Sequence, residues 1–196
     1  VRSVQIVRFP QYAATQHGKL VGRYLNGEFG QLANVSPWLS ALLYAGDRRE
    51  YAPTLSQALM TNDVVICDRY VYSNIAYHLA KLTTHHAAQT DELEALREFI
   101  YSLEFDQNHL PRPTTTCILD TPLKFAIQNM DAKKARNYTD KQRDLHEADM
   151  PYLEQVRRQF LQLADDNEFL RLDTVANDVL LPPAFIALSI HREVFE

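Results

Sequence analysis

Two features that would assign the chain to a broad class are missing: an excess of basic residues and a long apolar run. Its 196 residues contain 20 Lys and Arg against 25 Asp and Glu, a formal net charge of −5. Because nucleic-acid-binding proteins usually present a basic face, this balance argues against a nucleic-acid partner. No apolar run approaches the length of a membrane helix, and the first residues do not resemble a signal peptide. We therefore expect a cytoplasmic protein without a membrane partner.

Cysteine is scarce, which excludes a disulfide framework. The two cysteines, Cys67 and Cys117, stand in apolar runs and lack the spacing of a zinc site. We predict two buried free thiols in a reducing compartment.

Glycine is also scarce, with five residues, and this bears on phosphate binding. A phosphate-binding P-loop needs two glycines at fixed spacing, followed by Lys and then Ser or Thr. Here Gly18-Lys19 is followed by Leu20, and Ala13 stands where the first glycine belongs. Gly18-Lys19 is therefore not a P-loop.

What is present is an alternation of short apolar runs and amphipathic segments. Strands are expected at 4–7, 63–67, 115–119 and 169–172, and helices at 17–25, 73–82, 91–103, 149–163 and 182–191, with two more starting at 36–37 and at 122. The continuous apolar run at 63–67 predicts a strand buried on both faces. The alternation predicts an α/β fold in three layers, a parallel sheet with helices on both faces, within a single domain at 1–196.

Charged residues follow the predicted strands, where ligands of parallel sheets bind. Arg8-Phe9-Pro10, Asp68-Arg69-Tyr70 and Asp120 stand at such ends. Asp68 could hold a metal ion or its waters, and the guanidinium of Arg69 matches a phosphate. An ordinary ion pair at the end of a strand is the alternative.

Two residue pairs share helical faces. Tyr44 with Arg48 could stack on a base and reach its edge, and Asn74 with Tyr77 could pair with a base. The alternative is that Tyr44 belongs to the core, Arg48 and Asn74 face solvent, and Tyr77 is half-buried.

The segment 133–143 is rich in cations and lacks apolar periodicity. It contains Lys133, Lys134, Arg136, Lys141 and Arg143, and His146 and Glu147 follow it. Such cations could neutralise phosphate charge from a closing lid. A solvated loop is the alternative.

Taken in order, these residues resemble bacterial thymidylate kinases. The resemblance includes Arg8-Phe9-Pro10-Gln11-Tyr12, Leu42-Leu43-Tyr44-Ala45-Gly46-Asp47-Arg48, the long stretch from Asp68 to Tyr77, and Leu110-Pro111-Arg112-Pro113. It covers nearly the whole chain. It implies a P-loop nucleoside monophosphate kinase-like fold that transfers a phosphoryl group from ATP to dTMP, with Mg2+, for nucleotide biosynthesis.

The resemblance also implies a role for each matching position. Phe9 and Tyr12 would line the pocket, and Tyr44 would stack on thymine. Arg48 would contact the base and phosphate, Asn74 would contact the base, and Tyr77 would pack where a 2′-hydroxyl would clash. Asp68 would organise Mg2+, and Arg69 would bind the phosphate. Lys133, Lys134 and Arg136 would belong to a lid at about 131–147, with the catalytic cation undecided, and His146 and Glu147 would lie near the substrate. A homodimer is implied as well.

The chain departs from the family because it lacks the first strand, P-loop and helix. Since it starts without Met, we expect this unit, on the order of 30 residues, to lie upstream of Val1. The alternatives are a nucleotide-binding or scaffold protein that retains the fold without a P-loop, and a kinase for another deoxynucleotide such as dUMP.

Overall fold

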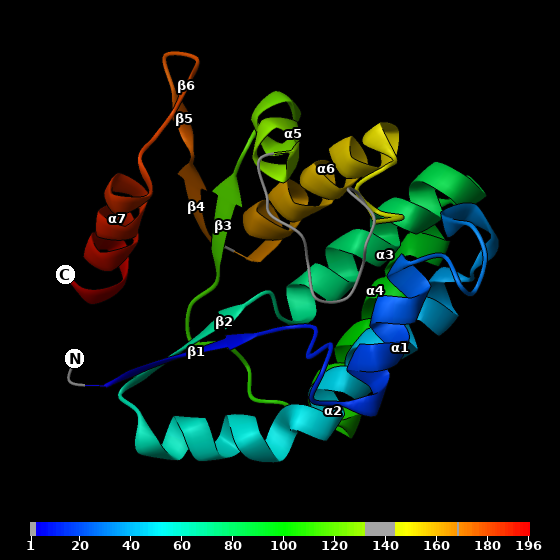
Figure 1. The fold of residues 1–196 in the computed structure, drawn as a ribbon, viewed down its shortest axis with the longest axis horizontal. Coiled ribbons are helices and arrows are strands. Elements are labelled where there is room, and N and C mark those ends of the chain that lie inside the picture. Colours follow the sequence, from blue (N-terminus) through cyan, green and yellow to red (C-terminus); the bar gives the residue numbers. More distant parts are fainter. Residues whose placement is uncertain (1–2, 132–143, 168) are drawn as a thin grey trace.

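The computed structural model describes residues 3–131, 144–167 and 169–196 (Figure 1). Its elements, in chain order, are β1 (Val4–Arg8), α1 (Gln16–Leu25), η1 (Leu32–Asn34), α2 (Pro37–Thr61), β2 (Val64–Asp68), α3 (Val71–His86), α4 (Thr90–Tyr101), η2 (Ser102–Gln107), β3 (Cys117–Asp120), α5 (Leu123–Asp131), α6 (Met150–Asn167), β4 (Leu170–Asp173), β5 (Val175–Ala176), β6 (Val179–Leu180) and α7 (Pro183–Phe195). The predicted alternation of strands and helices is confirmed.

Local sequence signals explain the ends of the first two helices. The Thr15 hydroxyl accepts a hydrogen bond from the Gly18 amide at 2.8 Å and caps α1, and Gly27 follows the helix with φ of 82°. Pro37 starts α2 in the first turn, where a missing N–H costs nothing. That helix continues through Pro53 to Thr61.

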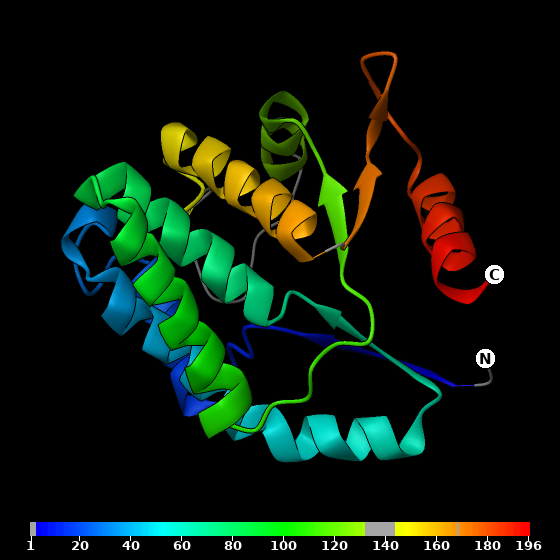
Figure 2. The same ribbon diagram turned by 180° about the vertical axis from the view of Figure 1, so that it is seen from behind.

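The four longer strands form two separate parallel pairs. In the first, β1 lies beside β2 with Arg8 opposite Asp68, and in the second, β3 lies beside β4. Figure 2 shows the two pairs from behind, and no strand among the described residues joins β2 to β3. The prediction that 63–67 is buried on both faces is wrong in this structure, since Ile66 is 49% exposed on β2 and Ile6 58% exposed on β1.

A short hairpin, β5–β6, was not predicted. Asn177 and Asp178 connect its strands with φ of 50° and 61°, as the mirror-image turns of tight hairpins require. Asn and Asp tolerate this backbone region better than most residues. The hairpin leads the chain from β4 to α7, which packs beside β4 (Figure 1).

The main core surrounds α3, which packs against α2, α4 and α6. Its buried side chains include Ile75, Leu79, Leu96, Ile100 and Leu163. Across the described ranges, no helix combines the length and the apolar character that crossing a bilayer requires. Cys67 and Cys117 are free, as predicted, but each is half-buried rather than buried.

Candidate functional site

The site begins at the turn between β2 and α3, where the chain reverses sharply. Arg69 has φ of 63°, in the left-handed region that non-glycine residues rarely adopt. This turn places the Arg69 guanidinium over the Tyr77 ring, with 5.3 Å between Cζ and the ring centroid. Two residues that the sequence singled out separately therefore lie in contact.

A buried polar cluster holds the next pair. Arg48 is 2% exposed, and its Nε donates to Glu104 Oε2 at 2.8 Å, while its Nη2 donates to Oε1. Burial alone would lower the pKa of Arg48, but the Glu104 carboxylate outweighs burial and raises it. Arg48 is thus a fixed, buried cation, and the alternative of a solvated Arg48 is wrong.

The side-chain NH2 group of Asn74 belongs to the same cluster. Its Nδ2 donates to Glu104 Oε1 at 2.7 Å and to the Ala41 carbonyl at 3.2 Å. These two acceptors fix the orientation of the amide. Asn74 Oδ1 is buried and has no hydrogen-bond partner among the residues that the structure describes. Asn74 is 2% exposed, so the alternative of a surface Asn is also wrong.

Seven of the predicted site residues line one cavity, whereas Tyr12, Asp68 and Glu147 are not among its lining residues. It is lined by Phe9, Pro10, Tyr44, Arg48, Arg69, Ser73, Asn74, Tyr77 and His146. Its volume is about 20 Å³, which is room for roughly one water molecule. A nucleotide can therefore enter only if side chains at its wall move.

Aromatic contacts define that wall. His146 stacks on Tyr77, with 5.3 Å between ring centroids and 27° between ring planes. Tyr44 packs edge-on against His78 at 5.4 Å. Phe9 is buried and packs edge-on against Tyr51. His146 and Tyr77 both line the cavity, so separating these two stacked rings would enlarge it.

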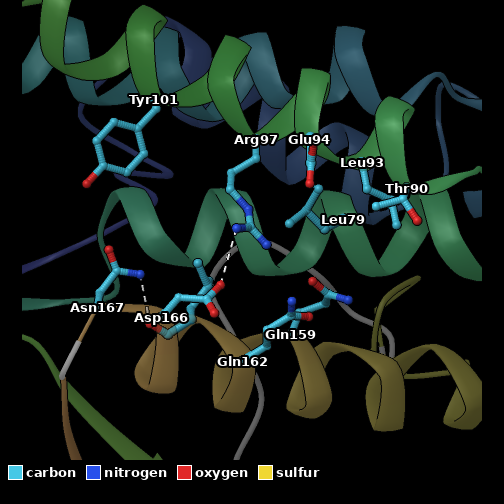
Figure 3. A pocket seen from close by; sticks show the side chains of 11 residues that line it. Leu79, Thr90, Leu93, Glu94, Arg97, Tyr101, Gln159, Gln162, Asp166 and Asn167 are labelled. Carbon is cyan, nitrogen blue, oxygen red and sulfur yellow. Dashed lines mark hydrogen bonds and ion pairs between the residues drawn. The ribbon is translucent and has the colours of Figure 1, made fainter.

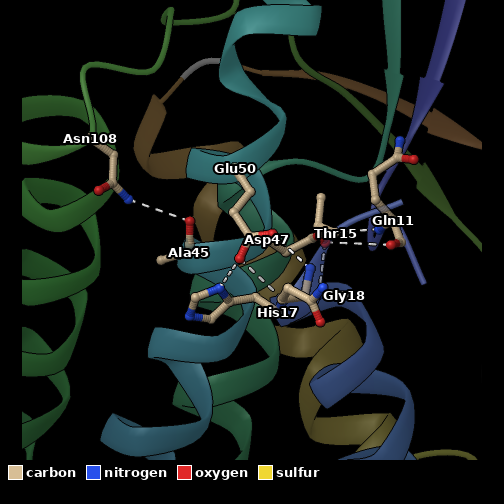
Figure 4. Close-up of polar contacts among 9 residues, drawn as sticks. Gln11, Thr15, His17, Gly18, Ala45, Asp47, Glu50 and Asn108 are labelled. Atoms are coloured by element: carbon tan, nitrogen blue, oxygen red, sulfur yellow. Dashed lines mark hydrogen bonds and ion pairs between the residues drawn. The ribbon is translucent and has the colours of Figure 1, made fainter. Parts of the chain in front are cut away.

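The loop from Phe9 to Thr15 is anchored to α2 by Asp47 (Figure 4). The buried carboxylate of Asp47 accepts hydrogen bonds from the Gln11 amide at 3.0 Å and from the Thr15 hydroxyl. Position 18 requires glycine, because a Cβ there would lie 2.2 Å from the Gln11 carbonyl oxygen. This glycine serves close packing, as expected for a position outside a P-loop. Tyr12 lies half-buried on this loop.

Asp68 and Asp120 end their strands in different environments. The Asp68 side chain is 61% exposed, with Arg8 Nε 3.3 Å from its Oδ2. Asp120 is buried and accepts from Arg157 at 2.7 Å and from Arg171 at 2.8 Å. Asp120 is therefore an ion-paired structural residue, whereas Asp68 keeps a carboxylate open to solvent.

The site contains few candidate metal ligands. Within the described ranges, no group of three or more His, Cys, Asp or Glu side chains gathers. Mg2+ commonly takes one or two carboxylates and completes its shell with water and substrate phosphates. The single exposed carboxylate of Asp68, beside Arg69, fits such a site.

The predicted lid is described only at its ends. Lys133, Lys134 and Arg136 lie outside the described residues. Beyond them, Asp144 Oδ1 accepts from the amides of His146 and Glu147, both at 3.0 Å. This turn brings His146 to the cavity wall. Glu147 belongs to the same turn.

A larger cavity lies elsewhere, between α3, α4 and α6 (Figure 3). Its volume is about 600 Å³, and none of the predicted site residues lines it. Its one cation, Arg97, donates to Asp166 across the opening at 3.2 Å. Size alone would favour this cavity, but the convergent cations and aromatic rings lie at the smaller one.

Sequence reasoning missed three residues of the site. Glu104 holds Arg48 and Asn74, and Tyr24 and Lys81 lie behind His146. Glu104 stands between Leu103 and Phe105, an apolar setting that signals a buried carboxylate. Tyr24 and Lys81 fall on apolar helix faces, where only the fold reveals that they meet.

Comparisons with known proteins show which family of sequences and which fold the chain resembles. A family model described as thymidylate kinase matches residues 2–179. The thymidylate kinase of Mycobacterium tuberculosis is 29% identical over 163 residues, which are 83% of this chain and 72% of that protein. The thymidylate kinase of Bifidobacterium longum is 30% identical over 177 residues, covering 88% of this chain and 75% of that protein. The solved structure of the Candida albicans thymidylate kinase has a TM-score of 0.66 at 23% identity, covering 97% of this chain and 80% of that one, and shares the fold.

Proposed function

Because the chain belongs to the thymidylate kinase family, and is therefore a phosphotransferase that converts dTMP to dTDP with ATP, we propose that the cavity beside Arg69 and Asn74 holds dTMP. The observation that carries this proposal is the buried, unpartnered Asn74 Oδ1 at the cavity. A buried acceptor without a partner costs about 1–3 kcal/mol, which a ligand N–H would recover. Thymine offers an N–H at N3.

The neighbouring groups suit the rest of the nucleotide. Arg48 is a cation held at the cavity by Glu104, and Tyr44 and Phe9 supply aromatic faces. Arg69 lines the same cavity, and its guanidinium, which packs over the Tyr77 ring, is the cation proposed to meet the phosphate. Tyr77, beneath Arg69, packs beside the sugar in this arrangement. The base thus lies deep, and the phosphate lies toward the carboxyl ends of β1 and β2.

Mg2+ would be held by Asp68, with ATP as the co-substrate. When bound, the ion neutralises phosphate charge. Arg69 holds the dTMP phosphate in place for attack on ATP, through charge-assisted hydrogen bonds. Arg8, 3.3 Å from Asp68, keeps that carboxylate at the strand end.

The proposed enzyme also has a lid and forms an assembly of two chains. A single domain at 1–196 carries a lid at about 131–147, in which Lys133, Lys134 or Arg136 supplies the catalytic cation and Glu147 lies near the substrate. The position of His146 at the cavity supports this lid. The enzyme is a cytoplasmic homodimer, and the large exposed apolar side chains of α2, Leu39 (63%) and Met60 (74%), are consistent with a subunit contact.

The direct test is turnover by the full-length gene product. We expect dTDP to form from dTMP with ATP and Mg2+, measured as ADP release in a coupled assay, and we expect thymidine and dCMP to be poor acceptors. dUMP has the same N3–H and is the acceptor that competes best. Absence of dTDP formation, with dTMP still bound, would support a binding or scaffold protein instead.

A further inference from the structure

Behind the cavity lies a lysine whose hydrogen-bond partners are hydroxyl groups. Lys81 on α3 is 0% exposed, and its Nζ donates to the Tyr24 hydroxyl at 3.0 Å and to Ser40 Oγ at 3.4 Å. Within the described part of the chain, no Asp or Glu forms an ion pair with it. Burial lowers the pKa of Lys81 to about 7, so its charge changes near neutral pH.

The Tyr24 hydroxyl has a second neighbour. His146 Nε2 lies 3.3 Å from it, and the two rings meet edge-on at 5.6 Å. One hydroxyl therefore stands between the Lys81 amino group and the imidazole. Ser40 is also a hydrogen-bond neighbour of Tyr24, but its Oγ already accepts from Lys81 at 3.4 Å and donates to the Ser36 carbonyl at 3.0 Å. Because the Tyr24 hydroxyl carries one hydrogen, it can donate to only one neighbour at a time, and it can donate to Lys81 only when Lys81 is neutral.

His146 connects this hydroxyl to the cavity. Its ring lines the cavity and stacks on Tyr77, which in turn lies under Arg69. The contacts thus run without a break from Lys81, through Tyr24, His146 and Tyr77, to the proposed phosphate-binding arginine.

We propose that Lys81 and Tyr24 are positioning residues that decide which ring nitrogen of His146 presents a hydrogen in the nucleotide site. Charged Lys81 can only donate, so Tyr24 donates to His146 Nε2 and the imidazole keeps its hydrogen on Nδ1. Neutral Lys81 can accept from Tyr24, so His146 donates from Nε2 and Nδ1 becomes an acceptor. One proton leaves Lys81 for solvent, and the imidazole stays neutral in both states.

Among the described titratable groups that surround His146, Lys81 is the one whose pKa lies between pH 6 and 9. Burial lowers the pKa of His146 to about 3. It also lowers the pKa of His78 and of His85, which lie on α3 together with Lys81. Burial raises the pKa of the surrounding phenols, which are Tyr24 of α1, Tyr44 of α2 and Tyr152 of α6. The Asp144 carboxylate faces Tyr24, and Arg69 contributes a positive charge near His146.

The relay is tested by the tautomer of His146 in the nucleotide-free chain. Protein labelled with ¹⁵N-histidine reports in long-range ¹H–¹⁵N spectra which ring nitrogen is protonated, and a His146→Gln variant assigns the signal. We expect hydrogen on Nδ1 at pH 6 and on Nε2 at pH 9. In Tyr24→Phe and in Lys81→Met this pH dependence disappears, whereas Lys19→Met, an exposed lysine on α1, retains it.

The same tautomer at pH 6 and pH 9 in the unmodified chain overturns the relay, as does a pH-dependent change that survives in Tyr24→Phe. The first observation needs no variant to fold. The consequence for dTMP rests on the proposed function: the dTMP Kd rises about two- to tenfold in Tyr24→Phe, as loss of one hydrogen bond implies. Failure of dTMP to bind the unmodified chain would count against the nucleotide site, while the tautomer spectra would still decide the relay.

Discussion

Arg69 combines a strained backbone with a guanidinium that packs over the Tyr77 ring in the wall of the cavity. If it binds the dTMP phosphate, Arg69→Ala removes charge-assisted hydrogen bonds worth about 1.5–3 kcal/mol. We predict that kcat/KM for dTMP falls about 10- to 150-fold, measured by steady-state kinetics. Arg158→Ala, which removes an arginine whose side chain is 68% exposed on α6, is the matched control and should change little. Kinetics within twofold of the unmodified enzyme would contradict the role of Arg69.

In the proposed complex, the Asn74 Oδ1, which is buried and has no partner among the described residues, would select the base. We predict that Asn74→Ala weakens dTMP binding about tenfold and reduces the preference for dTMP over dCMP, as measured by calorimetry with both nucleotides. Asn108→Ala, which removes a half-buried amide bonded to the Ala45 carbonyl, should preserve the preference. Equal binding of dCMP and dTMP by the unmodified chain would refute this assignment.

At this scale the sequence predicted which residues gather, but not what holds them. Phe9, Tyr44, Arg48, Asn74 and His146 do line one cavity, and their individual roles stay predictions. Glu104 could not be placed, because its partners lie 56 and 30 residues away in the chain. Spacing within one helix reveals a shared face, whereas a contact between helices depends on how they pack.

Among the elements, the loop from Phe9 to Thr15 depends on one buried carboxylate. Asp47→Ala leaves the Gln11 amide and the Thr15 hydroxyl without their acceptor, so we predict a loss of about 2–3 kcal/mol in the free energy of unfolding. Thermal unfolding should show a decrease of roughly 4–10 °C in Tm. Asp47→Asn keeps an acceptor oxygen and should cost less. A Tm within 1 °C of the parent for Asp47→Ala would show that the loop does not need this anchor.

Helices and strands could be predicted where the apolar periodicity was strong. They were harder to predict where turn chemistry or the length of an element determined the structure. The helix at 36–37 was expected from Pro37, yet its continuation through Pro53 was not. The Asn177-Asp178 turn was missed because the flanking strands have two residues each. The continuation of the helix past 101 is π-helical at Ser102–Gln107, and this irregular turn carries Glu104, which no regular period predicts.

The free energy of unfolding of the whole molecule should depend on pH through Lys81. Its pKa is about 7 in the folded chain, below the ordinary 10.5, so between these values the unfolded chain binds the additional proton. The contribution of Lys81 to the free energy of unfolding therefore rises as pH increases from about 7 to 10.5, by about 1.4 kcal/mol per pH unit. Urea unfolding of the unmodified chain and of Lys81→Met at pH 7 and pH 9 measures this slope.

The difference between these two proteins should grow with pH in favour of the unmodified chain, and Lys19→Met should follow the unmodified chain. A pH-independent difference would mean that Lys81 keeps an ordinary pKa in the folded state.

The central claim is that one cavity binds dTMP through its base and its phosphate. Calorimetric titration of the chain with dTMP, thymidine and dCMP tests it most directly, because binding is read without turnover. We predict one dTMP site per chain, with thymidine and dCMP each bound at least tenfold more weakly. Absence of dTMP binding, or equal affinity for dTMP and thymidine, would contradict the account.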